Sequence, residues 1–187
     1  MKSSLKNMVM VLFLITLICS AAIGGIYELT KDPIDAAKQA KTTAAISEVL
    51  PSFDRVENPE VRDVDGDKMK IYKAVTGNEI TGYAIETFSK KGFGGTIRIM
   101  VGFKPDGTIC GTSVISHSET PGLGDKIDKS KSDFSRQFEG KNPATFRLGV
   151  KKDGAGDVDA ITASTISSRA FTDAVKRAYE EMKSYIK

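Results

Sequence analysis

Five side-chain hydroxyls stand close together near the carboxyl end of the chain, in the segment "TASTISS" at 162–168. They belong to Thr162, Ser164, Thr165, Ser167 and Ser168, and no charged residue separates them. An amphipathic stretch follows, so the segment lies at the start of a helix. One hydroxyl is enough to cap a helix. The free N–H groups and the dipole of a helix start also favour a phosphate, and a phosphate held there could be esterified to a threonine hydroxyl.

A second segment, "HSETPGLG" at 117–124, combines polar side chains with residues that constrain or free the backbone. Glu119 and Thr120 precede a proline, which fixes the backbone, and Gly122 and Gly124 flank Leu123 and permit unusual backbone angles. Such a loop can present N–H donors and hydroxyls to the edge of a polar ring. An ordinary surface loop is the alternative interpretation.

A third segment, "GFGG" at 92–95, is rich in glycine. It could cradle a phosphate, but it lacks the Lys-Ser/Thr pair of a P-loop and does not open a helix, so alone it is weak evidence. A flexible bend at the start of a strand is one interpretation. The other is an exposed place where backbone N–H groups and Phe93 meet a flat ligand.

Two other patterns suggest chemistry but fit it poorly. His117 is the only histidine, and a hydrolase could use it with Ser116 or Ser118. Adjacent strand residues point to opposite faces, however, and no nucleophile-elbow motif is present. Asp63, Asp65 and Asp67 have the spacing of a calcium loop, but the positions that require glycine and a final acid hold Lys68 and Ala74. An acidic turn before a strand is favoured.

The cysteines and the overall charge exclude further classes. Cys19 and Cys110 belong to no CxxC pair, so we expect no metal site and no disulfide framework. The net charge is +3, with both signs interspersed along the chain. Without a basic stripe, nucleic-acid binding is disfavoured.

Residues 8–27 form an uncharged apolar stretch. Twenty helical residues span roughly 30 Å, the thickness of a bilayer core. Lys2 and Lys6 precede the stretch, and acidic residues follow it. The positive-inside rule then keeps the N-terminal tail in the cytoplasm and the rest of the chain outside. A cleaved signal peptide is the alternative, but its apolar region is typically only about 7–15 residues long, so we expect a retained single-pass anchor.

The remaining elements predict an α+β domain. After a short break, Asp32 is a plausible N-cap and Pro33 a first helical residue, and this helix ends before Pro51. Alternating apolar residues predict four strands. Their ranges are 68–76, 80–89, 95–103 and 109–116. Because no strand–helix–strand alternation appears, these strands should form an antiparallel meander.

The segments after the meander are expected to be a short helix, a strand and a final helix. The short helix at 132–140 is capped by Ser132 and closed by Gly140, and 144–150 is a candidate strand. The final helix starts at about Ser168 and carries an apolar stripe at helical spacing. The stripe consists of Phe171, Ala174, Val175, Ala178, Tyr179, Met182 and Ile186.

The segment "DAITAST", Asp159 to Thr165, resembles the covalent-flavinylation motif of FMN-binding domains, Asp-Gly-x-Thr/Ser-Gly-Ala-Thr. "HSETPGLG" and "KGFGGTIRIMVGF" are similar to other signatures of that domain. With its anchor and short length, the chain resembles the G subunits of Rnf ion-translocating ferredoxin:NAD oxidoreductase complexes. The C subunits of the sodium-pumping NADH:quinone oxidoreductase are relatives of that family.

This resemblance implies an electron carrier rather than an independent enzyme. A flavin transferase would attach FMN to Thr165 through a phosphoester. The residues implied to bind the cofactor are Glu119, Thr120, Gly122, Leu123, Gly124, Asp159, Thr162, Ser164 and Thr165. Ala160 and Ala163 replace the usual glycines, and Ser164 replaces the usual alanine and offers a competing hydroxyl. If residue 163 needs a positive φ, its alanine costs about 1 kcal/mol.

The resemblance also implies an organisation and a location. The expected parts are a cytoplasmic tail at 1–7, a transmembrane helix at 8–27, a connecting helix at 28–60 and an FMN-binding domain at 61–187. The protein would lie in the bacterial cytoplasmic membrane, with the FMN domain on the periplasmic or extracytoplasmic side. Its partners would be other subunits of a membrane redox complex. An anchored extracytoplasmic binding module without redox activity is the alternative.

Overall fold

The computed structural model describes residues 4–154 and 156–186. The chain divides into two compact units, Met1–Lys41 and Thr42–Lys187. The first described element is α1, Leu5–Val49, which contributes to both units. By length and composition, α1 is the one helix of the described residues able to cross a membrane, with a mean hydropathy of 2.6 in its apolar window. The large apolar side chains of that window are exposed within the structure, as a lipid-facing helix requires.

The break predicted between the anchor and a second helix is wrong, because α1 is continuous. Asp32 lies inside α1 instead of capping a new helix, and Pro33 is an interior residue. An interior proline removes a single helical hydrogen bond, and a long helix with good helix formers on both sides tolerates that loss. The helix ends at Val49, before Pro51 as predicted, so residues 50–60 of the expected connecting helix are not helical.

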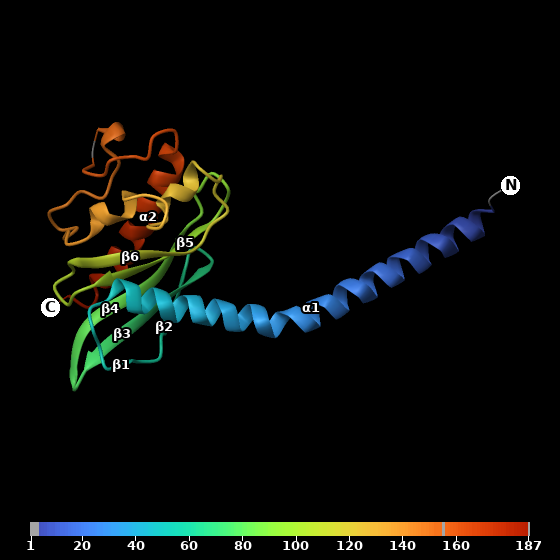
Figure 1. The fold of residues 1–187 in the computed structure, drawn as a ribbon, viewed down its shortest axis with the longest axis horizontal. Helices are drawn as coiled ribbons and strands as arrows, with labels where there is room; N and C mark the ends of the chain where they lie inside the picture. Colours follow the sequence, from blue (N-terminus) through green and yellow to red (C-terminus); the bar gives the residue numbers. More distant parts are fainter. Residues whose placement is uncertain (1–3, 155, 187) are drawn as a thin grey trace. The chain divides into compact units, whose positions relative to one another are not determined.

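One antiparallel sheet forms the centre of the second unit (Figure 1). Its strands are β1 (Arg55–Val56), β2 (Glu60–Val64), β3 (Asp67–Thr76), β4 (Glu79–Ser89), β5 (Ile97–Phe103) and β6 (Ile109–Ser116). The order is β1-β3-β4-β5-β6, and β2 also pairs with β3. The predicted four-stranded meander and the α+β class are confirmed. β1 and β2 were not predicted, because both are short and largely exposed.

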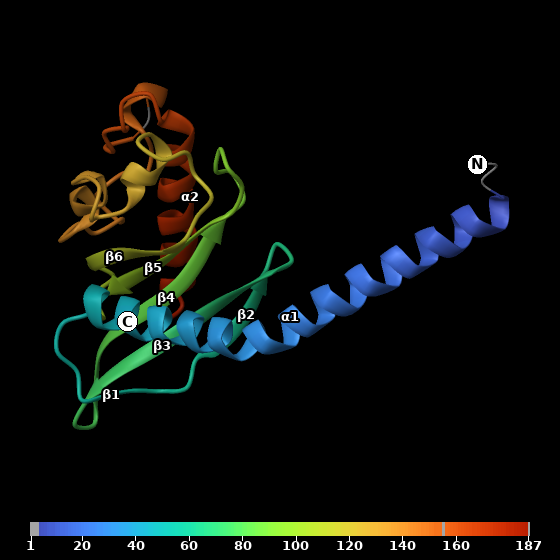
Figure 2. The same cartoon turned by 45° about the vertical axis from the view of Figure 1, so that its right-hand side comes forward.

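Helices cover both faces of this sheet (Figure 2). The final helix, α2, runs over Thr165–Met182, so it starts before the predicted Ser168. Its stripe residues from Phe171 to Met182 are all buried, and they pack with inward-facing strand residues such as Ile85 and Val101. The alternate residues of the same strands contact the last turn of α1, where Val49 is buried. Because side chains alternate along each strand, the sheet contributes to two hydrophobic cores, one on each face.

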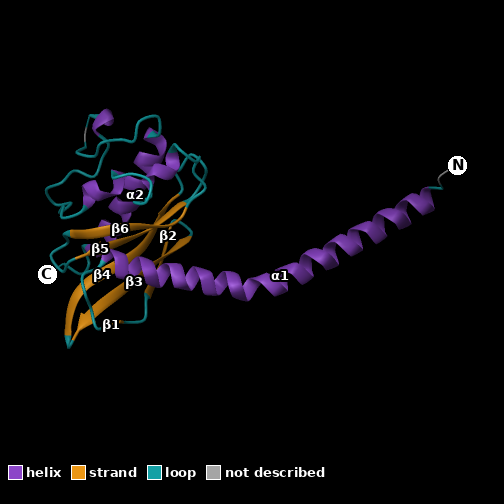
Figure 3. Cartoon of the chain, in the orientation of Figure 1, coloured by secondary structure: helices purple, strands orange, loops and turns teal. Residues whose placement is uncertain are grey.

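The segment between β6 and α2 consists mostly of loops and short helical turns (Figure 3). The turns are η1 (Gly124–Ile127), η2 (Phe134–Phe138) and η3 (Lys151–Asp153). η2 lies within the predicted short helix at 132–140 but is shorter, and Asp133 instead of Ser132 occupies its N-cap position. Ser132 Oγ accepts the Phe134 N–H at 3.1 Å, and Gly140 has a φ of +71°.

The strand predicted at 144–150 is wrong. The Asn142 side chain accepts the Ala144 N–H at 3.0 Å, and its carbonyl oxygen accepts the Phe146 N–H at 2.8 Å. These turn bonds take backbone groups that a strand would need. Only Val150 pairs, through one isolated parallel bridge to Val158.

Candidate functional site

A pocket of about 360 Å³ lies where three segments of the second unit meet. They are the glycine-rich loop between β4 and β5, the loop between β6 and η1, and the start of α2. The residues that line the pocket are Phe93, Glu119, Thr120, Leu123, Gly124, Ala163, Ser164, Thr165, Ile166 and Ser167. The structure therefore unites the three segments that the sequence singled out.

The start of α2 opens into this pocket. Ala163 has a φ of +61°, so the condition under which an alanine at this position is costly is met. Ser164 occupies the N-cap position but makes no capping bond through its side chain. Within the described part of the chain, the N–H groups of Thr165, Ile166 and Ser167 have no hydrogen-bond partner. Free donors of this kind, together with the helix dipole, favour an anion at this position.

The hydroxyls of the segment differ in how they are engaged. Ser164 is buried, and its Oγ lies 3.1 Å from Ser167 Oγ. Ser168 Oγ accepts the Ile161 N–H at 2.9 Å and donates to the Ser164 carbonyl oxygen at 3.0 Å. Thr165 is partly buried and lines the pocket. Its hydroxyl forms no hydrogen bond with any of the described residues. Of the hydroxyls at the start of α2 that line the pocket, Thr165 therefore offers the one without a hydrogen-bond partner among the described residues.

Glu119 connects the three segments around the pocket. Its side chain is buried, with 5% exposed. Oε1 accepts the Gly94 N–H at 2.9 Å, and Oε2 accepts a short hydrogen bond from Ser167. The close approach requires glycine at residue 94, since a Cβ there would lie 1.8 Å from the Ser118 carbonyl oxygen. One carboxylate thus holds the glycine-rich loop beside the first turn of α2.

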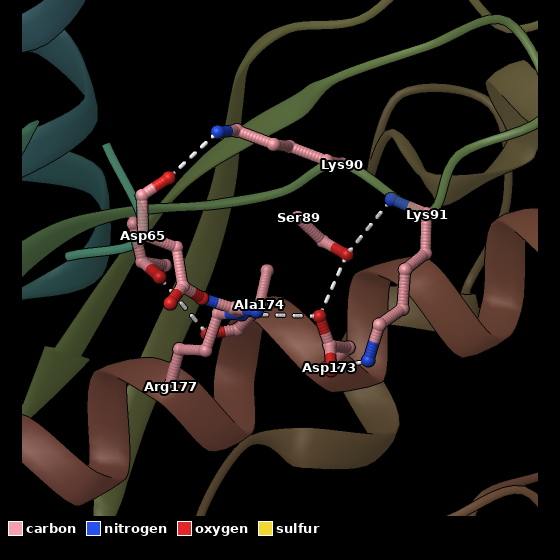
Figure 4. Close-up of polar contacts among 8 residues, drawn as sticks. Asp65, Ser89, Lys90, Lys91, Asp173, Ala174 and Arg177 are labelled. Carbon is pink, nitrogen blue, oxygen red and sulfur yellow. Dashed lines mark hydrogen bonds and ion pairs between the residues drawn. The ribbon is translucent and has the colours of Figure 1, made fainter. Parts of the chain in front are cut away.

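Asp173, farther along α2, holds the start of the same loop (Figure 4). Ser89 Oγ donates to Asp173 Oδ2 at 2.7 Å, and Lys91 Nζ lies 2.6 Å from Oδ1. Arg177 Nε also donates to Oδ2, at 3.2 Å. Burial acts to raise the pKa of Asp173, but the hydrogen bonds from Lys91, Ser89 and Arg177 outweigh it and hold the pKa below its usual value.

The turn between β2 and β3 joins this cluster. Arg177 Nη1 lies 2.5 Å from Asp65 Oδ2, and Lys90 Nζ donates to the Asp65 carbonyl oxygen at 2.8 Å. Asp65 and Gly66 both have positive φ and form the two-residue turn of a hairpin. The acidic segment is thus a turn before a strand. Two of its carboxylates pair with arginines: Asp65 with Arg177, and Asp67 with Arg98 at 2.8 Å.

Six of the nine predicted site residues line the pocket, and three do not. Gly122 is exposed, with a φ of +77° at the bend of its loop. Asp159 is exposed and pairs with Lys151 at 2.6 Å. Thr162 shares a shallow neighbouring depression with Asp159. The sequence analysis missed Asp173: Arg177 is its neighbour at i+4 on α2, but its partners Ser89 and Lys91 come from a distant segment.

The structure gives His117 a role in the backbone of its loop. Its Nδ1 accepts the Glu119 N–H at 3.1 Å. In the described chain, neither Ser116 nor Ser118 hydrogen-bonds to His117, and none of the three lines the pocket. The arrangement that a serine hydrolase needs is therefore missing from these residues.

The chain resembles known proteins over both of its parts. Residues 92–180 match the FMN-binding domain family, and residues 1–49 match the RnfG N-terminal region. The G subunit of the ion-translocating oxidoreductase complex of Shewanella amazonensis is 36% identical over 94% of this chain and 86% of its own length. The corresponding protein of Pasteurella multocida is 38% identical, over 89% of this chain and 88% of its own. That of Vibrio atlanticus is 35% identical, over 96% and 91%. The chain belongs to the family of G subunits of ion-translocating oxidoreductase complexes.

Proposed function

We propose that this protein is a membrane-anchored FMN flavoprotein that passes electrons within an ion-translocating ferredoxin:NAD oxidoreductase complex. FMN is bound covalently to Thr165 through a phosphoester. The observation that carries the proposal is the pocket, in which the unpartnered Thr165 hydroxyl stands at the open N-terminus of α2. The match of residues 92–180 to FMN-binding domains supports the same cofactor.

The residues present fit this cofactor. The pocket volume of about 360 Å³ falls in the range of small-molecule sites. The free N–H groups of Thr165, Ile166 and Ser167 would receive the phosphate. Phe93, Thr120, Leu123 and Gly124 would surround the ring. When bound, FMN supplies the exchange of one or two electrons, while the chain binds and orients it.

Thr165 is a better attachment site than Ser164. The Ser164 hydroxyl is buried and engaged with Ser167, whereas the Thr165 hydroxyl is unpartnered at the pocket wall. Esterification at Ser164 would break the contact with Ser167 and force a phosphate into a buried position. Esterification at Thr165 breaks no hydrogen bond of the described residues.

Asp159 and Thr162 belong to the motif but lie outside the pocket lining, and both are exposed. Their role in the proposal is recognition by the flavin transferase during maturation. Gly122 serves the loop instead, because its φ of +77° is costly for other residues. The nine predicted residues thus divide into the pocket wall, a bend and a surface for the flavin transferase.

The proposal includes a topology. Basic residues precede the apolar stretch of α1 and acidic residues follow it, so the N-terminus stays in the cytoplasm. The FMN domain then lies on the periplasmic or extracytoplasmic side of the bacterial membrane, where an ester bond keeps the cofactor from being lost. Fusions of alkaline phosphatase to the C-terminus should be active. If the C-terminal fusions are inactive and phosphatase fused at the N-terminus is active, the orientation is the opposite one.

The attachment is tested with the full chain, co-expressed with a flavin transferase. Wild-type protein should fluoresce under ultraviolet light in a denaturing gel, and digestion should give a peptide containing Thr165 that is heavier by FMN. The Thr165→Ala variant should lose both signals, and the matched Ser164→Ala variant should keep them. If Thr165→Ala keeps the flavin and Ser164→Ala loses it, the ester is at Ser164 instead. Wild-type protein without covalent flavin would favour a binding module without redox activity.

A further inference from the structure

Glu119 is a buried carboxylate in the wall of the pocket, with 5% of its surface exposed. Burying a charged group is costly unless hydrogen bonds or an opposite charge compensate it. Its two oxygens accept hydrogen bonds from the Gly94 N–H and the Ser167 hydroxyl. Both donors are neutral, and no basic side chain of the described residues forms an ion pair with this carboxylate.

The other buried acid of the described chain is compensated differently. Glu86 is also 5% exposed, but Lys70 lies 3.3 Å and Arg98 3.4 Å from its carboxylate oxygens. Glu86 pairs in register with Met100, which belongs to the core on the α1 side of the sheet, and it does not line the pocket. The structure thus supplies a matched pair of equally buried acids, one neutralised by cations and one not.

We propose that the negative charge of Glu119 lowers the reduction potential of the flavin held in this pocket. This inference rests on the proposed function, because it requires FMN on Thr165. Reduction adds negative charge to the cofactor, and a nearby fixed negative charge opposes that addition. A buried site screens this repulsion less than water does. The carboxylate is neither oxidised nor reduced, and the electrons come from the reductant.

Ser167 sets how strongly the carboxylate acts. Its hydroxyl donates to Glu119 Oε2 from the first turn of α2, so it stabilises the charge. Removing that donor leaves the negative charge less compensated. Neutralising Glu119 and removing Ser167 should therefore shift the potential in opposite directions, which a purely structural role of the two residues would not produce.

The experiment uses full-length protein in detergent, flavinylated by co-expression with the transferase. Covalent flavin is measured by fluorescence in a denaturing gel, and the midpoint potential by titration with dithionite and redox dyes. Glu119→Gln keeps the shape of the side chain, and the Ser167 hydroxyl can accept a hydrogen bond from the N–H of the new amide. We expect its potential to be more positive than that of the wild type. Ser167→Ala should be more negative, and the control Glu86→Gln should be unchanged.

Each outcome is decisive. Flavinylated Glu119→Gln with the wild-type potential overturns the inference. If Glu119→Gln carries no flavin, Ser167→Ala decides: a more negative potential supports the inference, and an unchanged or more positive one overturns it. Loss of flavin in both variants makes Glu119 a structural clamp and also overturns the inference. Wild-type protein without covalent flavin would instead refute the proposed function itself.

Discussion

Two carboxylates hold the same glycine-rich loop against α2, and they do so in opposite electrostatic settings. Asp173 fixes the start of the loop through Ser89 and Lys91, and Arg177 of the same helix is its second cation (Figure 4). Glu119 fixes its middle through neutral donors alone. A charge surrounded by cations stabilises the fold and has little field left to act at a distance. A charge held only by neutral donors keeps more of its field, which would then act on whatever occupies the pocket.

The difference follows from what each segment must do. Asp173 lies on the side of α2, with 20% of its side chain exposed, where long basic side chains can reach it from neighbouring segments. Glu119 lies in a pocket wall, where a lysine or arginine would fill the space for a ligand. Hydrogen bonds from a backbone amide and a small hydroxyl compensate a carboxylate without occupying that space.

The largest effect is expected from breaking the Glu119 bond by crowding the loop. In Gly94→Ala the new Cβ would lie 1.8 Å from the Ser118 carbonyl oxygen, so the backbone must move away from Glu119. We expect loss of most covalent flavin and a destabilisation of about 1–3 kcal/mol. Gel fluorescence and thermal unfolding of the full chain measure both. Thr96→Ala, at an exposed position of the same loop, is the control, and wild-type values for Gly94→Ala would contradict the geometry.

Removing the compensated carboxylate should cost stability without changing the redox properties. Asp173→Asn leaves Lys91 and Arg177 without their shared anion. We expect a loss of about 1–2 kcal/mol, measured by urea unfolding of the full chain in detergent. The flavin potential should stay at the wild-type value. A potential that moved as far as in Glu119→Gln would remove the contrast between the two sites. The control is Asp133→Asn, whose side chain is 89% exposed.

The contribution of Asp173 should depend on pH in a defined direction. Its pKa is lower in the folded protein than its usual value. Its stabilisation is therefore complete above the unfolded pKa, about 3.9, and is lost as the pH falls through the lower folded pKa. Unfolding midpoints of wild type and Asp173→Asn should converge as the pH is lowered from about 6 to 3. A gap that widened on acidification would contradict this sign.

The smallest effect on stability is expected at a third carboxylate, Asp159. It is exposed, and its pair with Lys151 is open to solvent. Asp159→Asn should change stability by less than about 0.5 kcal/mol, because exposed ion pairs contribute little. If this residue is recognised by the flavin transferase, covalent flavin should fall although the fold is intact. Thermal unfolding and gel fluorescence separate the two roles, and a marked loss of stability would show that Asp159 supports the fold instead.

Local patterns predicted most of the elements that surround the site. Period-two alternation located β3 to β6, and an uncharged apolar stretch located the helix able to cross a membrane. Local patterns failed where pairing between distant segments, or the ability of a long helix to tolerate a proline, decided the secondary structure. β1 and β2 exist because β3 offers them a partner edge. Pro33 stays inside α1 because a long helix survives one lost hydrogen bond.

The available chemistry can be read from the chain before it folds: a run of hydroxyls before a helix, and loops whose glycines allow close approach. Residue types and short spacing express both properties, and each acts within a few residues. The folded chain adds two facts: the Thr165 hydroxyl has no partner among the described residues while Ser164 and Ser167 are engaged, and Glu119 is buried without a cation. Burial and hydrogen-bond partners depend on segments far apart in the chain, which meet only when the sheet brings them together.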